Sequence, residues 1–202
     1  MIYMKKQYDD SSISSLKGAD RVRLRPGVIF GSDGLDGCCH SMFEILSNSI
    51  DEAREGYGDL IDVTLFNDNS IQIEDHGRGI PLGYNEKEEK FNWELVFCEL
   101  YAGGKYNNNS GDNYEYSLGL NGLGACATQY SSEYMDVEVR RDGQIHRLHF
   151  EKGENVGGLQ SEPTRFKATG TKIKWRPDLD VFTDISIPAE YFINVLKMRG
   201  YF

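Results

Sequence analysis

The chain has 202 residues, 39% of them hydrophobic, a length and composition that predict one compact domain with a sizeable core. Its 32 acidic residues outnumber 22 lysines and arginines, and the net charge of -10 would repel a phosphate backbone unless the cations are strongly segregated. The opening residues, MIYMKKQYDDSS, contain no apolar run, which argues against a signal peptide or a membrane span and leads us to expect a cytoplasmic protein.

The N-terminal region divides into a polar arm and a helix. Residues 1–20 are rich in serine and aspartate, which predicts an arm, and residues 21–202 are expected to form the domain. Proline and glycine recur between residues 21 and 37. This composition predicts a loop there, followed by a helix that begins near His40.

The predicted helix, FEILSNSIDEA, has two chemically different sides. At about 100° per residue, its apolar side contains Phe43, Leu46, Ile50 and Ala53. Its other side contains Glu44, Asn48, Asp51 and Glu52. We expect the acids to lie outside the core, and a solvated face would explain them. The asparagine argues mildly against that explanation, because it is a poor helix former where Glu or Lys would serve.

The rest of the chain predicts an α+β fold. Alternating hydrophobicity predicts strands at 62–66, 70–75, 135–140, 145–150 and 170–175. Helical spacing predicts helices at 92–101 and 189–198. Turn residues join the first two and the next two strands as hairpins. We therefore predict a two-layer sandwich, a mostly antiparallel mixed β-sheet covered on one face by helices.

Two glycine-containing segments are candidates for ligand binding. Asp75 ends a predicted strand directly before HGRG, where the glycines let the backbone approach a ligand and the carboxylate can accept a hydrogen bond from it. An ordinary Asx-type turn is the alternative. The segment GLNGLG, residues 119–124, can offer backbone NH groups to phosphate at the start of a helix. The long polar loop before it is expected to be a flexible flap.

Taken together and in this order, these elements resemble the ATP-binding fold shared by gyrase, heat-shock protein 90 chaperones, histidine kinases and MutL, the GHKL superfamily. The strings RPGVIFGS, FEILSNSIDEA, EDHGRGIP, LYAGGKY, GLNGLGA and GTKIKW resemble the ATPase domain of the B subunit of DNA gyrase and its topoisomerase IV counterpart. The resemblance implies an ATP-binding and ATP-hydrolysing domain of a type II DNA topoisomerase, which couples ATP-driven dimer closure to strand passage. It leaves gyrase versus topoisomerase IV open.

The resemblance assigns roles to the polar side of the first long helix. Glu44 matches the general base that activates water against the terminal phosphate, and Asn48 matches the residue that holds magnesium. Glu52 and Arg78 resemble a salt-bridged pair at the pocket rim, and Arg147 resembles the arginine beside them. ATP and Mg²⁺ are therefore the implied cofactors.

The resemblance also assigns the adenine pocket and the phosphate lid. Asp75 matches the carboxylate that binds the adenine amine, and Thr171 matches the threonine that supports this contact. The adenine would be lined by Gly79, Ile80 and Pro81. The lid would start at Lys105, and its backbone NH groups would reach the phosphates from Leu120, Asn121, Gly122, Leu123 and Gly124.

This chain departs from the family pattern in the lid, where LGLNGLG replaces the usual GGLHGVG, and at His76, where an acid is common. The implied partners are the A subunit and a second B subunit, DNA bound mainly by other parts of the full enzyme, and ATP-competitive inhibitors. Because the chain ends before a transducer domain could fit, we expect a fragment that binds ATP but hydrolyses it slowly. A MutL-like ATPase and a non-catalytic nucleotide-sensing module are the alternatives, and the presence of Glu44 and Asn48 disfavours the second.

Overall fold

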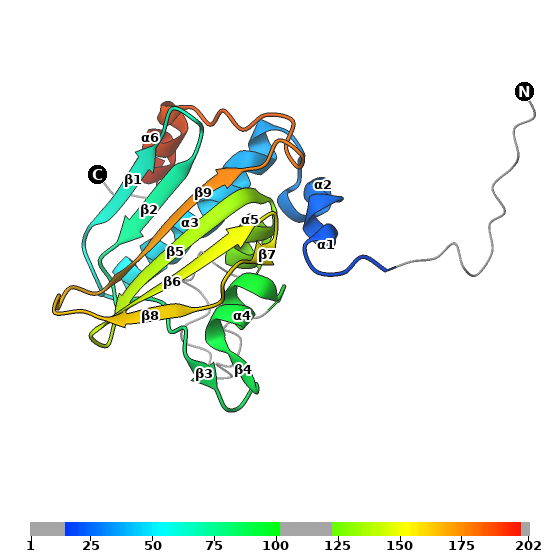
Figure 1. The fold of residues 1–202 in the computed structure, drawn as a ribbon. Helices are drawn as coiled ribbons and strands as arrows, with labels where there is room; N and C mark the ends of the chain where they lie inside the picture. Colours follow the sequence, from blue (N-terminus) through cyan, green and yellow to red (C-terminus); the bar gives the residue numbers. More distant parts are fainter. Residues whose placement is uncertain (1–14, 102–122, 199–202) are drawn as a thin grey trace, which may run out of the picture.

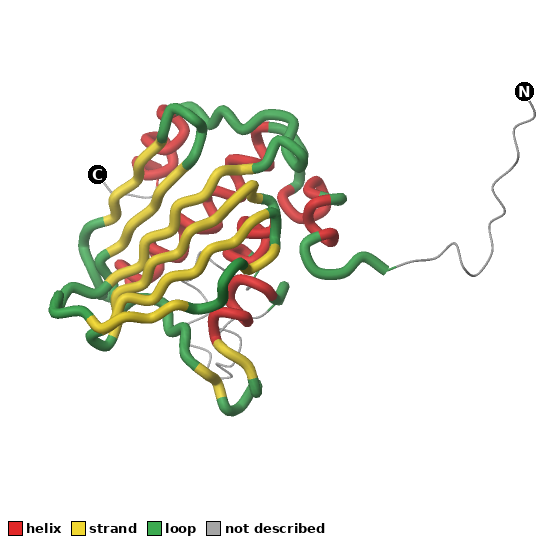
Figure 2. Tube along the Cα trace, in the orientation of Figure 1, coloured by secondary structure: helices red, strands yellow, loops and turns green. Residues whose placement is uncertain are grey.

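The computed structural model describes residues 15–101 and 123–198, which form two packed layers (Figure 1). One layer is a seven-stranded sheet with the order β1-β2-β9-β5-β6-β7, in which β8 also pairs with β6. Helices cover one face of this sheet (Figure 2). The predicted α+β sandwich is therefore confirmed, although every described strand pair is antiparallel rather than mixed.

The strands predicted from sequence all form. The main sheet contains β1 (Ile61–Leu65), β2 (Ile71–Asp75), β5 (Ser132–Arg141), β6 (Gln144–Glu151), β7 (Glu154–Asn155), β8 (Gln160–Pro163) and β9 (Gly170–Pro177). A separate small hairpin pairs β3 (Tyr84–Asn85) with β4 (Lys90–Phe91). Because β9 lies between β2 and β5, a late segment of the chain completes the centre of the sheet.

Strand side chains alternate between the face that the helices cover and the open face. On β2, Ile71, Ile73 and Asp75 are buried, whereas the residues between them are only partly buried. On β9, Thr171, Ile173 and Trp175 are buried in the same way. The register pairs Ile73 with Ile173, so the two sets form one surface under the helices. Asp75 and Thr171 consequently lie at the same end of that surface.

Helices from the middle of the chain pack their apolar sides on this surface, whereas the two N-terminal helices pack on other helices. The helices are α1 (Asp20–Arg23), α2 (Pro26–Phe30), α3 (Leu35–Arg54), α4 (Asn92–Cys98), α5 (Gly124–Tyr130) and α6 (Ala189–Met198). Large side chains that are almost completely buried include Trp175, Phe97, Phe150, Met42, Leu46 and Ile50. Each contributes roughly 1.5–3 kcal/mol by leaving water. Among the helices of the described ranges, none is both long and apolar enough to span a membrane.

Two sequence-based expectations about α3 are wrong. The helix begins at Leu35, not near His40, because Gly37 belongs to its first turns. A Cβ at Gly37 would lie 2.0 Å from the carbonyl oxygen of Ser32, so this glycine permits close packing and does not mark a loop. Asp51 is only 3% exposed, so one of the four polar residues is part of the interior.

Other helix boundaries also differ from the prediction. The segment before α3 contains α1 and α2, and Pro26 starts α2, where a missing N–H is tolerated. Helix α4 ends at Cys98 instead of residue 101, because Glu99 is extended and Tyr101 has a positive φ of 68°. The predicted helix at 189–198 is confirmed as α6.

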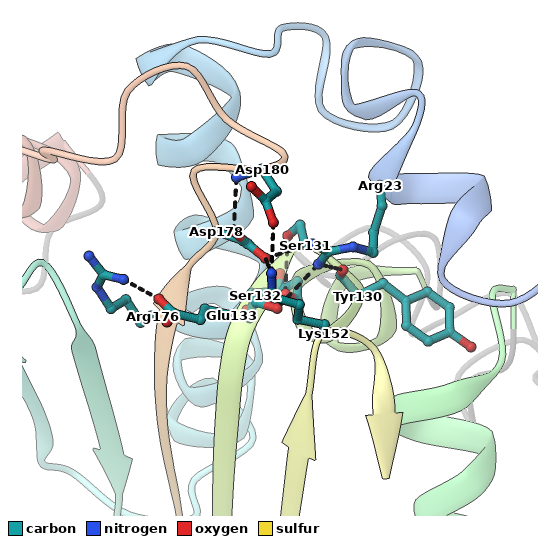
Figure 3. Close-up of polar contacts among 10 residues, drawn as sticks. Arg23, Tyr130, Ser131, Ser132, Glu133, Lys152, Arg176, Asp178 and Asp180 are labelled. Carbon is teal, nitrogen blue, oxygen red and sulfur yellow. Dashed lines mark hydrogen bonds and ion pairs between the residues drawn. The ribbon is translucent and has the colours of Figure 1, made fainter.

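A buried ion pair connects α1 to the end of β9 (Figure 3). One terminal nitrogen of Arg23, Nη2, lies 2.6 Å from Asp178 Oδ2, and the two side chains are 14% and 6% exposed. The other, Nη1, donates to the carbonyl oxygens of Tyr130 at 3.0 Å and Ser132 at 3.4 Å. The amide of Asp178 in turn donates to the Ser131 carbonyl. One guanidinium therefore joins the N-terminal helix, the end of α5, the start of β5 and the end of β9.

Candidate functional site

The centre of the candidate site is the carboxylate of Asp75, at the end of β2. Its Oδ1 accepts hydrogen bonds from the amides of Gly77 at 3.1 Å and Thr171 at 3.2 Å, and its Oδ2 accepts one from Ser49 Oγ at 3.1 Å. Burial raises the pKa of Asp75, although these three hydrogen bonds oppose the shift. An ionised carboxylate can accept about four hydrogen bonds, so the donors within residues 15–101 and 123–198 leave about one acceptor position.

The loop after Asp75 passes too close to neighbouring backbone for side chains. Gly79 has φ +79°, and a Cβ there would lie 2.9 Å from the carbonyl oxygen of Arg140. Gly170 has φ +147°, and its Cβ would lie 2.2 Å from the carbonyl oxygen of Asp75. The amide of Ile80 donates to Thr171 Oγ1 at 3.1 Å. The start of β9 therefore fixes both the carboxylate and the glycine loop in place.

An ion-pair cluster forms one edge of this loop. Arg78 and Glu52 make a two-point contact, Nε to Oε1 and Nη2 to Oε2, both at 2.8 Å. Glu55 accepts from the same Nη2 at 2.6 Å, and the guanidinium carbon lies 3.6 Å from the centre of the Tyr57 ring. The expected pairing of Glu52 with Arg78 is therefore confirmed, and it links α3 to the glycine loop.

Glu44 and His40 form a second pair on α3, one turn apart. His40 Nδ1 lies 3.1 Å from the carbonyl oxygen of Phe30, and Nε2 lies 3.2 Å from Glu44 Oε1. A carbonyl oxygen only accepts, so Nδ1 must carry a proton. The contact between Nε2 and Oε1 then needs one more proton, held by either partner. Partial burial raises the pKa of Glu44, while His40 opposes that rise.

The start of α5 lies directly against Glu44. A Cβ at Gly124 would lie 2.2 Å from Glu44 Oε2, so only glycine leaves room for the carboxylate. The amide of Ala127 donates to the carbonyl oxygen of Leu123 at 2.7 Å, which orders the turn at this point. Asn48 is exposed on α3 one turn beyond Glu44. The last residues of the GLNGLG segment therefore meet the polar side of α3.

A family comparison agrees with this arrangement. The sequence profile described as "Histidine kinase-, DNA gyrase B-, and HSP90-like ATPase" matches residues 35–181. The chain belongs to this ATPase family. The match includes α3, β2 and β9, the elements that contribute Glu44, Asp75 and Thr171 to the site.

Relatives within the ATPase family are B subunits of type II topoisomerases. The DNA gyrase B subunit of Thermotoga maritima is 41% identical over 194 residues, which are 96% of this chain and 29% of the relative. The DNA topoisomerase 4 B subunit of Staphylococcus aureus is 42% identical over 181 residues, which are 89% of this chain and 27% of the relative. The chain thus spans less than a third of these curated relatives.

Solved structures of the ATPase family share the fold. The 43K ATPase domain of Thermus thermophilus gyrase B, in complex with an aminocoumarin, has a TM-score of 0.73 at 31% identity, and the match covers 89% of this chain and 44% of that one. The topoisomerase IV ATP binding domain of Francisella tularensis, in complex with a small molecule inhibitor, has a TM-score of 0.74 at 29% identity, with coverages of 91% and 84%.

The structure does not place Arg147 beside the pair formed by Glu52 and Arg78, so that expectation is wrong. Arg147 pairs in register with Glu138 on the open face of the sheet, and its guanidinium contacts Glu138 and Glu162. Asp75 is on the covered face. The strand period of two separates the faces, and the sequence alone did not show which face each arginine would occupy.

Arg141 reaches the site instead. Its Nη1 donates to the carbonyl oxygen of Gly79 at 2.8 Å. The residue before it, Arg140, pairs in register with Gly170, next to Thr171. Pairing the predicted strand at 135–140 with the one at 170–175 would have identified this position from sequence. His40 and Ser49 were also missed, and the i, i+4 spacing of His40 to Glu44 was the available signal.

Four predicted lid residues lie outside the described residues: Lys105, Leu120, Asn121 and Gly122. Of the remaining predicted residues, Ile80 is partly buried against the core, and Pro81 is exposed after it. The structure thus brings the residues predicted to bind adenine, the Glu52–Arg78 ion pair and the surroundings of Glu44 to one side of α3 and one end of β2.

Proposed function

We propose that the chain is the ATP-binding and ATP-hydrolysing domain of a type II DNA topoisomerase, of the gyrase or topoisomerase IV B-subunit kind. Its role would be to couple ATP-driven dimer closure to DNA strand passage by the whole enzyme. The observation that carries the proposal is the Asp75 carboxylate, which is buried and accepts from three donors of the described residues, fewer than the about four that a carboxylate can accept. Family membership and the relatives named above support the same conclusion.

Adenine recognition follows from that carboxylate. An exocyclic amine donates hydrogen bonds, and the remaining acceptor position of Asp75 would receive one of them. Thr171 would support the contact, because its amide donates to Asp75 and its hydroxyl accepts from Ile80. Gly79, Ile80 and Pro81 would line the ring. The side-chain-free approach at Gly79 leaves space for a flat heterocycle next to the backbone.

Hydrolysis would depend on Glu44 as the general base. For this role the proton between the pair must reside on His40 Nε2, so that Glu44 is a carboxylate. The imidazolium would then hold Oε1 and leave Oε2, which faces Gly124, to accept the proton of the attacking water. His40 is a positioning residue in this scheme, and the Phe30 carbonyl fixes its ring.

The residues present suit a magnesium ion only in combination with a nucleotide. Within 15–101 and 123–198, no cluster of three His, Cys, Asp or Glu side chains could hold a metal. Asn48 offers one exposed amide oxygen, the hard type of ligand that Mg²⁺ prefers, and phosphate oxygens and water would have to supply the others. The bound ion would neutralise phosphate charge.

The partners of the proposal are those of the whole enzyme: an A subunit, a second B subunit and DNA. Inhibitors that compete with ATP are proposed as ligands of the same pocket, because solved relatives are described with an aminocoumarin and with another small-molecule inhibitor. The lid residues Lys105 and 120–124 are proposed to contact the phosphates.

The test separates binding from turnover. Affinity for a non-hydrolysable ATP analogue and single-turnover hydrolysis are measured for the wild-type chain and for Glu44→Gln, with and without Mg²⁺. We expect the variant to keep its affinity and to lose turnover by roughly 100-fold or more, because a general base contributes about that much. Glu138→Gln, on the open face, is the matched control. The catalytic role of Glu44 would be rejected if Glu44→Gln and Glu138→Gln turned over ATP at the same rate, or if the wild-type chain showed no turnover.

A further inference from the structure

A hollow with a basic lining lies beside the candidate site. Its volume is about 420 Å³, and two loops form its walls. One is the tip of the β5–β6 hairpin, residues 141–144, and the other is residues 164–169, between β8 and β9. The second loop extends beyond the ends of the strands (Figure 1), and residues 165–169 of it are exposed. We call this feature the basic hollow.

The basic hollow concentrates positive charge on an acidic molecule. Arg141, Arg165 and Lys167 line it, against a single acid, Asp142. Asp142 is 82% exposed and pairs with Arg141 Nε at 3.1 Å. Arg165 and Lys167 are exposed, and no acidic side chain of the described residues pairs with either. A chain with a net charge of -10 thus keeps unpaired cations at one place, which is the segregation that binding to a polyanion requires.

The walls of the basic hollow are fixed by hydrogen bonds. Thr169 Oγ1 donates to the carbonyl oxygen of Gly77 at 2.6 Å, and Arg141 Nη1 donates to that of Gly79 at 2.8 Å. The amide of Thr164 donates to the carbonyl oxygen of Gly143 at 2.9 Å, which joins the two loops. Arg141 is held in this way and loses little freedom when it binds an anion, and the backbone that carries Arg165 and Lys167 is anchored at Thr164 and Thr169.

An aromatic side chain stands among the cations. Phe166 is 74% exposed between Arg165 and Lys167, and its amide donates to Thr164 Oγ1 at 3.1 Å. A ring exposed to this extent contributes little to the core and is accessible to a partner. Guanidinium groups form two-point contacts with phosphate, and an aromatic ring can pack on the sugars and bases beside it.

We propose that the basic hollow binds the phosphodiester backbone of duplex DNA. This inference rests on the proposed topoisomerase function, which brings DNA to the enzyme. It assigns a DNA contact to this domain, next to the nucleotide loop, through Arg165 and Lys167, which the nucleotide site does not use, and through Arg141, which also holds the Gly79 carbonyl. Asp142 opposes the contact and limits its strength.

The number of cations sets the salt dependence. Three phosphate contacts give a slope of about -2.7 in log K against log salt concentration, since each contact contributes about -0.9. Removal of Arg165 and Lys167 leaves one contact and a slope of about -0.9. Affinity for duplex DNA at low salt should fall by roughly tenfold or more in the same variant.

The experiment measures fluorescence anisotropy of a short labelled DNA duplex with the 202-residue chain at several salt concentrations. The test variant is R165E/K167E. The matched control is K17E/K87E, which replaces two exposed lysines elsewhere and carries the same net charge. We expect the test variant to lose affinity and slope, the control to keep both, and D142N to bind more tightly than wild type.

Three results would overturn the inference. They are equal losses in the two double variants, equally tight binding of polyglutamate, and no binding of the duplex by the wild-type chain at low salt. Affinity for the ATP analogue is measured on the same samples. If the wild-type chain binds the analogue but not the duplex, only the DNA-binding role of the basic hollow is rejected. If it does not bind the analogue, the proposed function itself is rejected.

Discussion

Replacement of Arg23 should destabilise the fold far more than its position near the N-terminus implies. Arg23→Met removes the partner of the Asp178 carboxylate, which is 6% exposed, and the donor for the Tyr130 and Ser132 carbonyls (Figure 3). Loss of one member of a buried pair costs about 3–5 kcal/mol, because the other charge stays buried. Lys152 Nζ lies 4.0 Å from the same carboxylate and would compensate in part, so we expect about 3 kcal/mol.

Urea and thermal unfolding, both followed by circular dichroism, measure this loss. With about 2–4 °C per kcal/mol for a chain of this size, the melting temperature should fall by roughly 6–12 °C. Lys152→Met is the control, since its main contact, to Asp180, is solvent-exposed and its removal should change stability little. The double variant Arg23→Met with Asp178→Asn should recover part of the loss, because no buried charge remains. A loss below about 1 kcal/mol in Arg23→Met would refute the reasoning.

Three further predictions concern the site. Burial raises the pKa of Glu44 in the fold, so its contribution to stability is present at low pH and is lost as the pH rises through the folded pKa. Urea unfolding should therefore show wild type losing stability relative to Glu44→Gln as the pH rises above about 4.5. A constant difference would contradict this. Gly124→Ala should lower the rate of single-turnover hydrolysis by roughly tenfold or more, with a smaller effect on analogue affinity, because the added Cβ would displace the Glu44 carboxylate. An unchanged rate would show that the contact between Gly124 and Glu44 does not matter for hydrolysis. Calorimetry should show that Arg141→Ala weakens analogue binding roughly two- to tenfold and that Arg147→Ala does not. The reverse result would support the prediction from sequence that Arg147 belongs to the nucleotide pocket.

The sheet was largely predictable because its signals are local. The alternation in 62–66 and 70–75, and the Asp-Gly turn after Arg141, each specify a hairpin within a few residues. The position of β9 between β2 and β5 is a long-range pairing that periodicity does not reveal. That pairing decides which arginine reaches Gly79, and this is why the prediction for Arg147 is wrong.

The helical boundaries were harder because tertiary contacts override propensity. Gly37 signals a loop by itself, but its closeness to Ser32 makes it part of α3. Asp51 has the spacing of a solvated residue, yet it is buried. Within the site, Glu44 and Asp75 were identified as candidates from type and position, whereas the pairing of Glu44 with His40 needed the geometry of Phe30 as well.

The central claim, that Asp75 anchors the adenine of ATP, is tested most directly by isothermal titration calorimetry with a non-hydrolysable ATP analogue and Mg²⁺. The account predicts binding to the wild-type chain and a loss of about 10- to 150-fold for Asp75→Asn, since a hydrogen bond to a charged group contributes roughly 1.5–3 kcal/mol. Thermal unfolding of both proteins confirms that the variant is folded. Analogue affinity that is the same in a folded Asp75→Asn variant as in wild type would contradict the account.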